Sequence, residues 1–313
     1  MARYTLRQLE CFVAVGEHGS IAGAAAALMI SPSAITGALN ELERAFNSQL
    51  TIRRKARGVS LTPSGQYVLS QARGLLNAAT DLQVMAADAG STLRGKVAIG
   101  CYSSLAPTLL TELMAECGSR HPEVELDFLA GTQQEIHEKL LSGELDLAIA
   151  YELTVPPGLT RKRLREAVPA VVLPADHRLV ARDKVALAEL VDEPMILLDV
   201  NPSRENTEMM FSAAGLTPWI RFRTTDFEVT RSMVARGMGY AILVQRPIAD
   251  VSYEGRPLVI RPIHPATRNV PISMIWNEGV SLSKNAQAML DLAIEMLRGA
   301  HPGDRGVGRG GAP

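Results

Sequence analysis

The hydrophobic and polar positions of residues 31–46 follow a helical spacing. Apolar side chains recur every three or four residues, at Ile35, Ala38, Leu39 and Leu42, which predicts a helix with one buried face. Ser31 is a suitable N-cap for this helix, and Pro32 fits its first position, where no backbone donor is needed. The opposite face carries only small or polar residues: Ser33, Thr36, Gly37 and Asn40.

A shorter helix precedes this one. Ser20 can cap a helix that runs through Leu28, and its small residues at 22–27 allow close packing against a neighbour. Met29 and Ile30 then form a tight apolar turn. An earlier amphipathic helix, marked by apolar residues from Leu6 to Val15 and ending near Gly16 to Gly19, should pack on both. This pattern is typical of a helix-turn-helix, whose slim second helix can enter a DNA major groove.

A basic run at residues 53–57 lies between two short alternating segments, with apolar residues at Leu50, Ile52, Val59 and Leu61. The alternation predicts a two-stranded hairpin, or wing, with a basic tip. Cations at the tip would neutralise phosphates and fix the register on DNA without reading its sequence. The alternative is a solvated surface charge run, which the neighbouring helix-turn-helix disfavours.

The charge balance supports this interpretation. Residues 1–65 contain seven Lys or Arg and four Glu, a net charge of +3, so the remainder carries −4 of the total of −1. Four of those seven cations fall at 53–57. Such a local basic cluster matters more for DNA than the overall pI near 6.6.

A long helix is predicted at residues 64–89, which contain no proline. Apolar positions step by four and three residues along it, as in a heptad seam. So narrow a seam needs a partner helix, and dimerisation is the natural one; packing against the chain's own domain is the alternative. A linker follows at 90–95. The seam positions are Val68, Ala72, Leu75, Ala79, Leu82 and Ala86.

From Lys96 onward, short apolar strands alternate with helices, which is typical of a parallel α/β sheet. Two lobes are implied, with the chain crossing between them near 165–169 and 263–270, both Pro-bearing. The Gly-rich residues 301–313 should form a disordered tail. Strands are predicted at 97–100, 124–129, 145–150, 170–173, 195–198, 220–223, 241–244, 258–260 and 272–276, and helices at 104–117, 133–141, 205–214, 229–236 and 285–297.

The composition excludes several classes of protein. With 47% hydrophobic and 21% charged residues, the 313-residue chain can bury the cores of two or three domains. No apolar run approaches the roughly 18 residues of a membrane span, and the N-terminus lacks a secretory h-region, so a cytoplasmic protein is expected. Cys11, Cys101 and Cys117 lie in apolar patterns without a Cys-x-x-Cys. Buried free thiols are therefore predicted, rather than a zinc site or a disulfide framework.

Together these residues resemble the LysR-type transcriptional regulators, over nearly the whole chain except the Gly-rich tail. The resemblance implies an α plus α/β fold: a winged helix-turn-helix at 1–63, a linker helix at 64–89 and an effector domain at 90–300. That domain would be two-lobed and like a type 2 periplasmic binding protein, with lobe I at about 95–165 and 266–298 and lobe II at about 169–263. The segments that carry the match are Leu6-x-x-Leu9-x-x-Phe12, Gly19-Ser20-x-x-x-Ala24-Ala25, Ser31-Pro32-Ser33-Ala34-Ile35-Thr36, Leu39-x-x-Leu42-Glu43, Leu50-x-x-Arg53 and Leu61-Thr62-x-x-Gly65.

The resemblance also implies a set of DNA-binding residues. The recognition helix would present Ser31, Pro32, Ser33, Thr36, Gly37 and Asn40; the wing, Arg53, Arg54 and Lys55; and Thr62 would contact a phosphate. Family members often carry Arg or another long polar residue where this chain has Gly37, which cannot read a base. Base readout should therefore depend on Ser33, Thr36 and Asn40, and on groove shape.

The effector cleft is implied in the same way, at strand ends where open α/β sheets bind ligands. At each such strand end, called a corner, free backbone N–H groups and hydroxyls at the start of the next helix would be suited to bind an anion. Helix capping alone is the alternative role of these residues. Arg204 favours a carboxylate-bearing ligand, such as the small organic acids common in the family, unless it pairs with Glu205, Glu208 or another subunit. The corner residues are Ser103, Ser104, Thr132, Asn201, Ser203, Arg204, Thr225 and Asp226.

The implied function is a ligand-responsive, homotetrameric regulator that binds a dyad-symmetric DNA site and contacts RNA polymerase. No metal, cofactor or catalytic residue is expected, because no Ser/His/Asp or Cys/His arrangement has a meaningful spacing. A thiol or peroxide sensor is the second alternative, but the apolar pattern predicts buried Cys101 and Cys117. A secreted solute-binding protein is the third, and the DNA-binding head argues against it.

Overall fold

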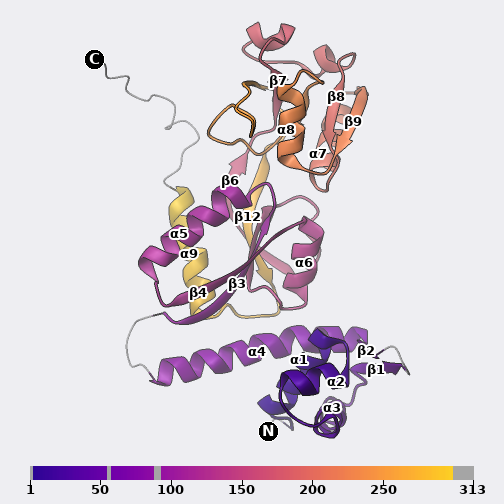
Figure 1. Ribbon diagram of the computed structural model, residues 1–313, viewed down its shortest axis with the longest axis vertical. Coiled ribbons are helices and arrows are strands. Elements are labelled where there is room, and N and C mark those ends of the chain that lie inside the picture. The colour runs from indigo at the N-terminus through magenta and orange to yellow at the C-terminus, as the bar shows by residue number, and fades with distance from the viewer. Residues whose placement is uncertain (1–2, 55–57, 88–92, 299–313) are drawn as a thin grey trace.

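The computed structural model describes residues 3–54, 58–87 and 93–298 of the chain (Figure 1). A helical head with a small hairpin lies at one end, lobe I lies in the middle and lobe II at the other end. The long helix α4, Pro63–Ala87, runs between the head and lobe I. This arrangement confirms the predicted fold class of a winged helix-turn-helix followed by a two-lobed α/β domain.

The head consists of α1 (Leu6–His18), α2 (Ile21–Ala27), α3 (Pro32–Phe46) and the antiparallel strands β1 (Thr51–Arg54) and β2 (Gly58–Leu61). Both predicted caps are confirmed: the Ser20 hydroxyl accepts a hydrogen bond from the Gly23 N–H at 3.0 Å, and Ser31 accepts one from Ala34 at 3.2 Å. A further N-cap at Thr5 forms a capping box with Gln8. The core includes Leu9, Phe12, Val15, Ala24, Ile35, Leu39 and Leu42.

The predicted seam of α4 is not one continuous face. Val68 and Ala72 pack into the core of the head, where Leu69 is also buried. Leu75 and Leu82 instead keep 43% and 67% of their surface exposed. Packing on the chain's own domain therefore accounts for the first part of α4. The second part presents exposed apolar residues one heptad apart, and dimerisation through them stays a prediction.

Lobe I contains a five-stranded sheet in the order β4-β3-β5-β12-β6. The strands β3, β4 and β5 are parallel, whereas β12 is antiparallel to both of its neighbours. Helices α5 and α9 lie on one side and α6 on the other (Figure 1). The bounds are β3 Gly95–Tyr102, β4 Val124–Gly131, β5 Leu147–Tyr151, β6 Leu159–Ala167, β12 Val270–Asn277, α5 Thr111–Arg120, α6 Gln133–Leu141 and α9 Lys284–Arg298.

Two features of lobe I differ from the sequence prediction. Strand β6 was not predicted, because five of its nine residues are charged and it has no apolar alternation. The single helix expected at 104–117 is instead a π-helical turn, η1, at Ala106–Leu110, followed by α5. A π turn often accompanies a functional site, and this one is separated from the end of β3 only by residues 103–105.

Lobe II has smaller sheets, and they are not all parallel. Strands β10 (Ala241–Leu243), β7 (Ala170–Pro174) and β11 (Leu258–Pro262) form an antiparallel sheet, while β8 (Met195–Leu198) and β9 (Ile220–Thr224) pair in parallel. Helices α7 and α8 pack beside them (Figure 1). The prediction of a parallel sheet is therefore correct only for β8 and β9 in this lobe. The helical bounds are η2 Arg178–Ala181, η3 Leu187–Leu190, α7 Ser203–Ala213 and α8 Phe227–Ala235.

The chain passes from lobe I to lobe II between β6 and β7, and returns between β11 and β12. Two crossings of this kind allow one lobe to rotate against the other. Within the described ranges, no single helix is long and apolar enough to span a membrane; the bent pair α2 and α3, at 109°, meets the criterion by length and composition only.

Candidate DNA-binding and effector sites

The outer surface of the first turns of α3 carries small side chains. Ser31, Pro32, Ser33 and Gly37 are exposed, and Thr36 is half-buried. Apart from the adjoining residues and backbone of α3 itself, no atom lies within 4 Å of where a Cβ on Gly37 would stand, so this face is open to a partner at that point. Behind it, Ile35, Leu39 and Leu42 are buried in the head. The predicted groove-facing residues thus share one exposed face and the apolar ones share the buried face.

The wing is anchored to α3 by the side chains of Glu43 and Asn40. Glu43 accepts hydrogen bonds from the backbone N–H groups of Leu50 and Thr51, at 2.8 and 2.9 Å, and so holds the start of β1. Arg53 donates to the Asn40 side-chain oxygen at 2.7 Å. Asn40 is therefore bound to the wing, and Arg53 lies beside the recognition helix. The tip at 55–57, with Lys55, lies outside the described residues, as does the side chain of Arg54.

Thr62 has a clear structural role. Its hydroxyl donates to the carbonyl of Gln49 at 2.7 Å and accepts from the N–H of Gly65 at 2.9 Å, so it caps α4 and fixes the exit of the wing. A hydroxyl has one hydrogen to donate, and here Gln49 takes it. A phosphate contact by Thr62 stays a prediction.

A cavity of about 620 Å³ lies between the lobes. It is lined from lobe I by the ends of β3 and β4 and from lobe II by the start of α8 and the segment after β10. Three of the four predicted strand-end corners therefore meet at one cavity. Five of the eight predicted effector residues line it: Ser103, Ser104, Thr132, Thr225 and Asp226.

Two of these residues also cap helices. The Thr132 hydroxyl accepts from the N–H of Glu135 at 3.2 Å at the start of α6, and Asp226 accepts from Val229 at 2.8 Å at the start of α8. Capping satisfies one free N–H at each helix start and leaves others available. Two helix N-termini, with their partial positive charge, thus open at the same cavity from opposite lobes.

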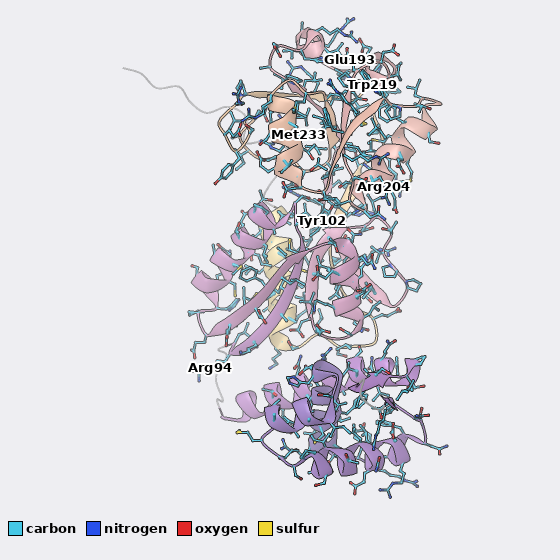
Figure 2. The ribbon with its side chains drawn as sticks, turned by 45° about the vertical axis from the view of Figure 1, so that its right-hand side comes forward. Arg94, Tyr102, Glu193, Arg204, Trp219 and Met233 are labelled. Atoms are coloured by element: carbon cyan, nitrogen blue, oxygen red, sulfur yellow. The ribbon has the colours of Figure 1, made fainter. Side chains whose placement is uncertain are left out.

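The remaining three predicted residues do not line the cavity. Arg204 donates to Asp199 at 3.1 Å and to the Asn201 side chain at 2.8 Å, and Arg223 holds the other oxygen of Asp199 at 3.2 Å. Arg204 therefore pairs with Asp199, rather than with Glu205 or Glu208 as the sequence allowed, and it does not line the cavity. Ser203 contacts Tyr102 across the lobes, with 3.4 Å between the hydroxyl oxygens. Figure 2 shows Tyr102 and Arg204 where the two lobes meet.

Several lining residues were missed by sequence reasoning. Gln245 of lobe II donates to the Thr108 hydroxyl of lobe I at 2.9 Å, a direct polar link across the cavity. Tyr102 packs edge-on against Tyr151 with ring centroids 5.5 Å apart, and burial raises its pKa. None of these residues caps a helix, so the capping rules behind the sequence prediction could not identify them. Their positions depend on how the lobes approach each other.

Arg231 is a further lining residue, and its side chain is only 3% exposed. Its guanidinium donates to Glu228 at 2.8 Å and to the backbone carbonyls of Ala249 and Val251. Glu228 in turn accepts a hydrogen bond from the N–H of Tyr253. The pair therefore fastens the loop after β10 along the rim of the cavity. Both acidic groups of the lining, Asp226 and Glu228, are thus already engaged by donors.

The three cysteines are buried free thiols, as predicted. Burial raises the pKa of Cys101 to about 12, and burial also raises the pKa of Cys117. The reactive form of cysteine is the thiolate, which is scarce when the pKa is so high. In the described part of the chain, no group of three or more His, Cys, Asp or Glu is placed to hold a metal ion.

A slim exposed helix in a winged head, joined to a two-lobed domain with a cavity between its lobes, defines a ligand-responsive DNA-binding regulator. Two family models match the chain: the bacterial regulatory helix-turn-helix protein, lysR family, over residues 6–66, and the LysR substrate binding domain over residues 90–298. The chain belongs to the LysR family of transcriptional regulators, whose members are not enzymes.

Three similar proteins illustrate the match. An uncharacterized HTH-type transcriptional regulator, YvbU, of Bacillus subtilis is 30% identical and covers 94% of this chain and 98% of its own. A hydrogen peroxide-inducible genes activator of Pectobacterium carotovorum is 26% identical, over 94% and 97%. The crystal structure of HinK, a LysR family regulator from Pseudomonas aeruginosa, is 35% identical with a TM-score of 0.64, over 94% and 98%. Each match spans head and effector domain together.

Proposed function

We propose that this regulator binds a dyad-symmetric promoter site as a homotetramer and switches on a small organic acid held between its lobes. The observation that carries the proposal is the cavity of about 620 Å³, lined from both lobes by hydroxyls and two helix N-termini. Such groups favour an anion, because helix N-termini offer unpaired N–H donors and partial positive charge. Since Asp226 and Glu228 are already paired, they oppose a carboxylate less than free carboxylates would.

The link between the lobes supports a switching role. Gln245 and Thr108 join the lobes directly, and Ser203 lies against Tyr102. A ligand that inserts among these contacts would bind one closure of the lobes better than another. Only such differential binding can shift a conformational equilibrium. The proposal therefore places the switch in the angle between the lobes, with the two crossings as hinges.

The DNA-binding part of the proposal assigns base readout to Ser33 and Thr36 on α3, and phosphate contacts to Arg53, Arg54, Lys55 and Thr62. Pairing of two chains through the exposed part of α4 would present two heads to a two-fold site. We infer that the tetramer acts in the cytoplasm and changes its contacts with RNA polymerase when the ligand binds.

A thermal-shift screen of the full chain tests the ligand class. Small mono- and dicarboxylic acids are compared with their amides, which have the same shape without the charge. At about 100 times its Kd, a binding acid should stabilise the chain by about 2.7 kcal/mol, whereas its amide should not. Stabilisation by amides as strong as by the acids would contradict an anionic effector.

The peroxide-sensing alternative has less support. The chain resembles an activator named for hydrogen peroxide, but at only 26% identity. Cys101 is buried and has a raised pKa, and Cys117 is buried as well. Neither thiol therefore has the exposed, low-pKa environment of a redox sensor. Mass spectrometry that detects a Cys101–Cys117 bond under mild oxidant would reverse this preference.

A further inference from the structure

Helix α4 presents a polar face to lobe I that is distinct from its apolar seam. Ser70, Arg73, Gly74 and Asn77 are three or four residues apart and so share one face of the helix. Ser70 accepts a hydrogen bond from Asn277 of lobe I at 2.8 Å, and Asn77 donates to Asp146 at 3.3 Å. The linker helix is therefore bound to lobe I of its own chain along at least two turns.

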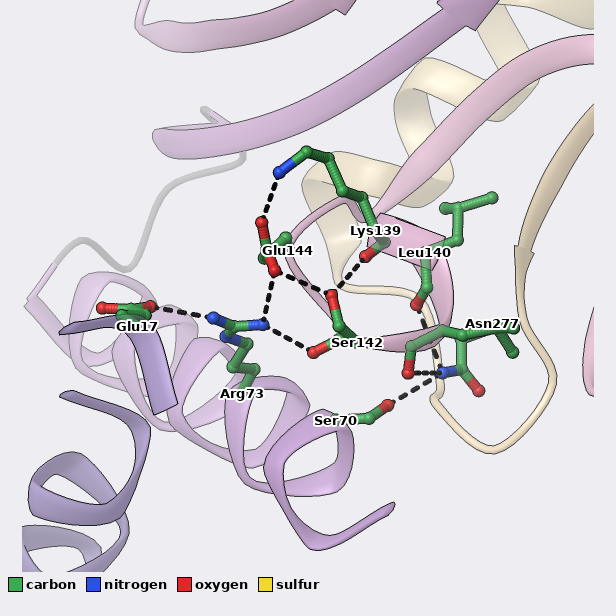
Figure 3. A network of polar contacts seen from close by, with 9 residues as sticks. Glu17, Ser70, Arg73, Lys139, Leu140, Ser142, Glu144 and Asn277 are labelled. Atoms are coloured by element: carbon green, nitrogen blue, oxygen red, sulfur yellow. Dashed lines mark hydrogen bonds and ion pairs between the residues drawn. The ribbon is translucent and has the colours of Figure 1, made fainter. Parts of the chain in front are cut away.

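Arg73 is at the centre of this contact (Figure 3). Its side chain is 8% exposed, and the guanidinium donates to Glu17 of the head at 3.2 Å, to the Ser142 carbonyl at 2.7 Å and to Glu144 at 3.5 Å. Lys139 of α6 holds the other oxygen of Glu144 at 2.6 Å. One buried charge thus joins the head, the linker helix and lobe I. A buried guanidinium left without such partners is costly, which favours keeping all three parts together.

Glycines on both sides allow the close approach. A Cβ at Gly74 would stand 2.8 Å from a methyl of Val280, and one at Gly143 would stand 3.1 Å from the Ser70 carbonyl. A Cβ at Gly279 would stand 2.7 Å from the side-chain nitrogen of Gln71. Three positions without side chains therefore lie where α4 meets lobe I. The two surfaces therefore approach closely at these three points, beside a cavity of about 930 Å³ that α4 and lobe I line together.

Helix α6 connects this contact with the cavity between the lobes. Thr132, which lines the cavity, caps its first turn, and Ser142, whose carbonyl binds Arg73, is its C-cap. Nine helical residues span about 13 Å. Ile136 and Leu140 are buried in the core of lobe I, so the helix is packed along its length. A displacement at one end of so short and well-packed a helix is transmitted to the other.

We infer that α6 and the Arg73 contacts form a link through which occupancy of the cavity repositions the DNA-binding head. The link consists of Thr132 at the cavity, Ser142 and Glu144 at the far end of α6, Arg73 on α4, and Glu17 on α1. It rests on the proposed function of the cavity as the effector site. By reciprocity, DNA on the head must also affect the cavity end of α6.

Hydrogen exchange of the full chain tests the contact without DNA or effector. Glu144→Gln removes the charge that pairs with Arg73 and Lys139, and Glu17→Gln removes the partner in the head. Each should raise amide exchange in residues 68–77 about fivefold, because a weakened docking contact opens more often. Glu125→Gln is the matched control, since Glu125 pairs with Lys96 within lobe I, at 3.3 Å and well exposed. Wild-type exchange at 68–77 in both variants would overturn the link.

The second arm adds a duplex from the chain's own promoter region. In the wild type, bound duplex should change exchange at residues 132–141 as well as in the head; in Glu144→Gln, the change should be confined to the head. Bound duplex that leaves residues 132–141 unaltered in the wild type would contradict the coupling. Failure of the wild type to retain the duplex would instead overturn the proposed function, while the first arm still decides on the contact.

Discussion

Gly37 provides a test of stability at a single residue. It lies within α3, where glycine costs roughly 1 kcal/mol relative to alanine, and a Cβ there would meet no neighbouring atom. Gly37→Ala should therefore raise the free energy of unfolding by roughly 1 kcal/mol, measured by urea denaturation.

Gly58→Ala is the contrasting control. Gly58 has a φ of +79°, and an added Cβ would stand 2.4 Å from the Gly19 carbonyl. This variant should be destabilised, because the new methyl group collides with backbone at a left-handed position. Equal effects of the two substitutions would contradict the view that Gly37 faces open space.

We expect His137 to make the stability of lobe I depend on pH. It is buried on α6, and burial lowers its pKa below the ordinary value of about 6.5. The unfolded chain therefore takes up a proton more readily, so this contribution is present above about pH 6.5 and lost as the pH falls toward the lowered pKa. Urea denaturation from about pH 7.5 to about pH 5.5 should show a smaller loss of stability for His137→Leu than for the wild type.

Particular residues show how far the sequence predicts a site. Capping rules depend only on neighbours in the chain, and they predict helix caps at Ser31, Thr132 and Asp226. All three residues do cap helices. The contacts of Gln245 and Arg204 could not be predicted in this way. The partner of Gln245 lies far away in the sequence, and Arg204 had more than one possible partner. Gln245 reaches Thr108 across 137 positions, and Arg204 had several possible carboxylates.

At the scale of elements, β6 and α4 mark the limits of periodicity. Apolar alternation does not reveal β6, because it is an edge strand rich in charged residues. Its conformation is determined by pairing with β12. Helix α4 was predicted as a helix. Its heptad spacing did not show which of its residues would pack against the head, which against lobe I, and which would remain exposed to solvent. Which face a helix buries depends on neighbours that local spacing does not identify.

The wing gives a prediction about DNA affinity. Arg53 lies next to α3, bound to Asn40, and we expect it to contact a DNA phosphate. Arg53→Ala should weaken binding on all sequences and reduce the slope of log K against log salt by about 1. Filter binding over a salt series measures this slope. Arg182→Ala, an exposed cation of lobe II, is the control and should leave it unchanged; an unaltered slope for Arg53→Ala would exclude a phosphate contact.

The start of α6 gives a prediction about ligand response. Thr132→Ala removes the cap and should cost about 1 kcal/mol of stability, whereas Thr132→Ser keeps the hydroxyl. The thermal shift with a binding acid should therefore be reduced in Thr132→Ala and retained in Thr132→Ser. Both variants should still retain DNA in a salt-dependent manner, because neither substitution touches the head. A normal ligand shift in Thr132→Ala would remove this residue from the effector site.

At the scale of the whole molecule, the order of head, helix and two lobes was predictable because each part has its own local pattern. The relative placement was not: the cavity, the link from Gln245 to Thr108 and the docking of α4 on lobe I all join distant segments. The proposed function depends on this assembled arrangement, in which the head and the cavity lie at opposite ends of lobe I (Figure 1).

The most direct test is footprinting of the purified chain on duplex DNA from its own promoter region, over a series of salt concentrations. Two protected half-sites related by a dyad, about one helical turn or a multiple of it apart, with retention that falls steeply as salt rises, are expected. A chain that protects no segment of that DNA at any salt concentration would contradict the account.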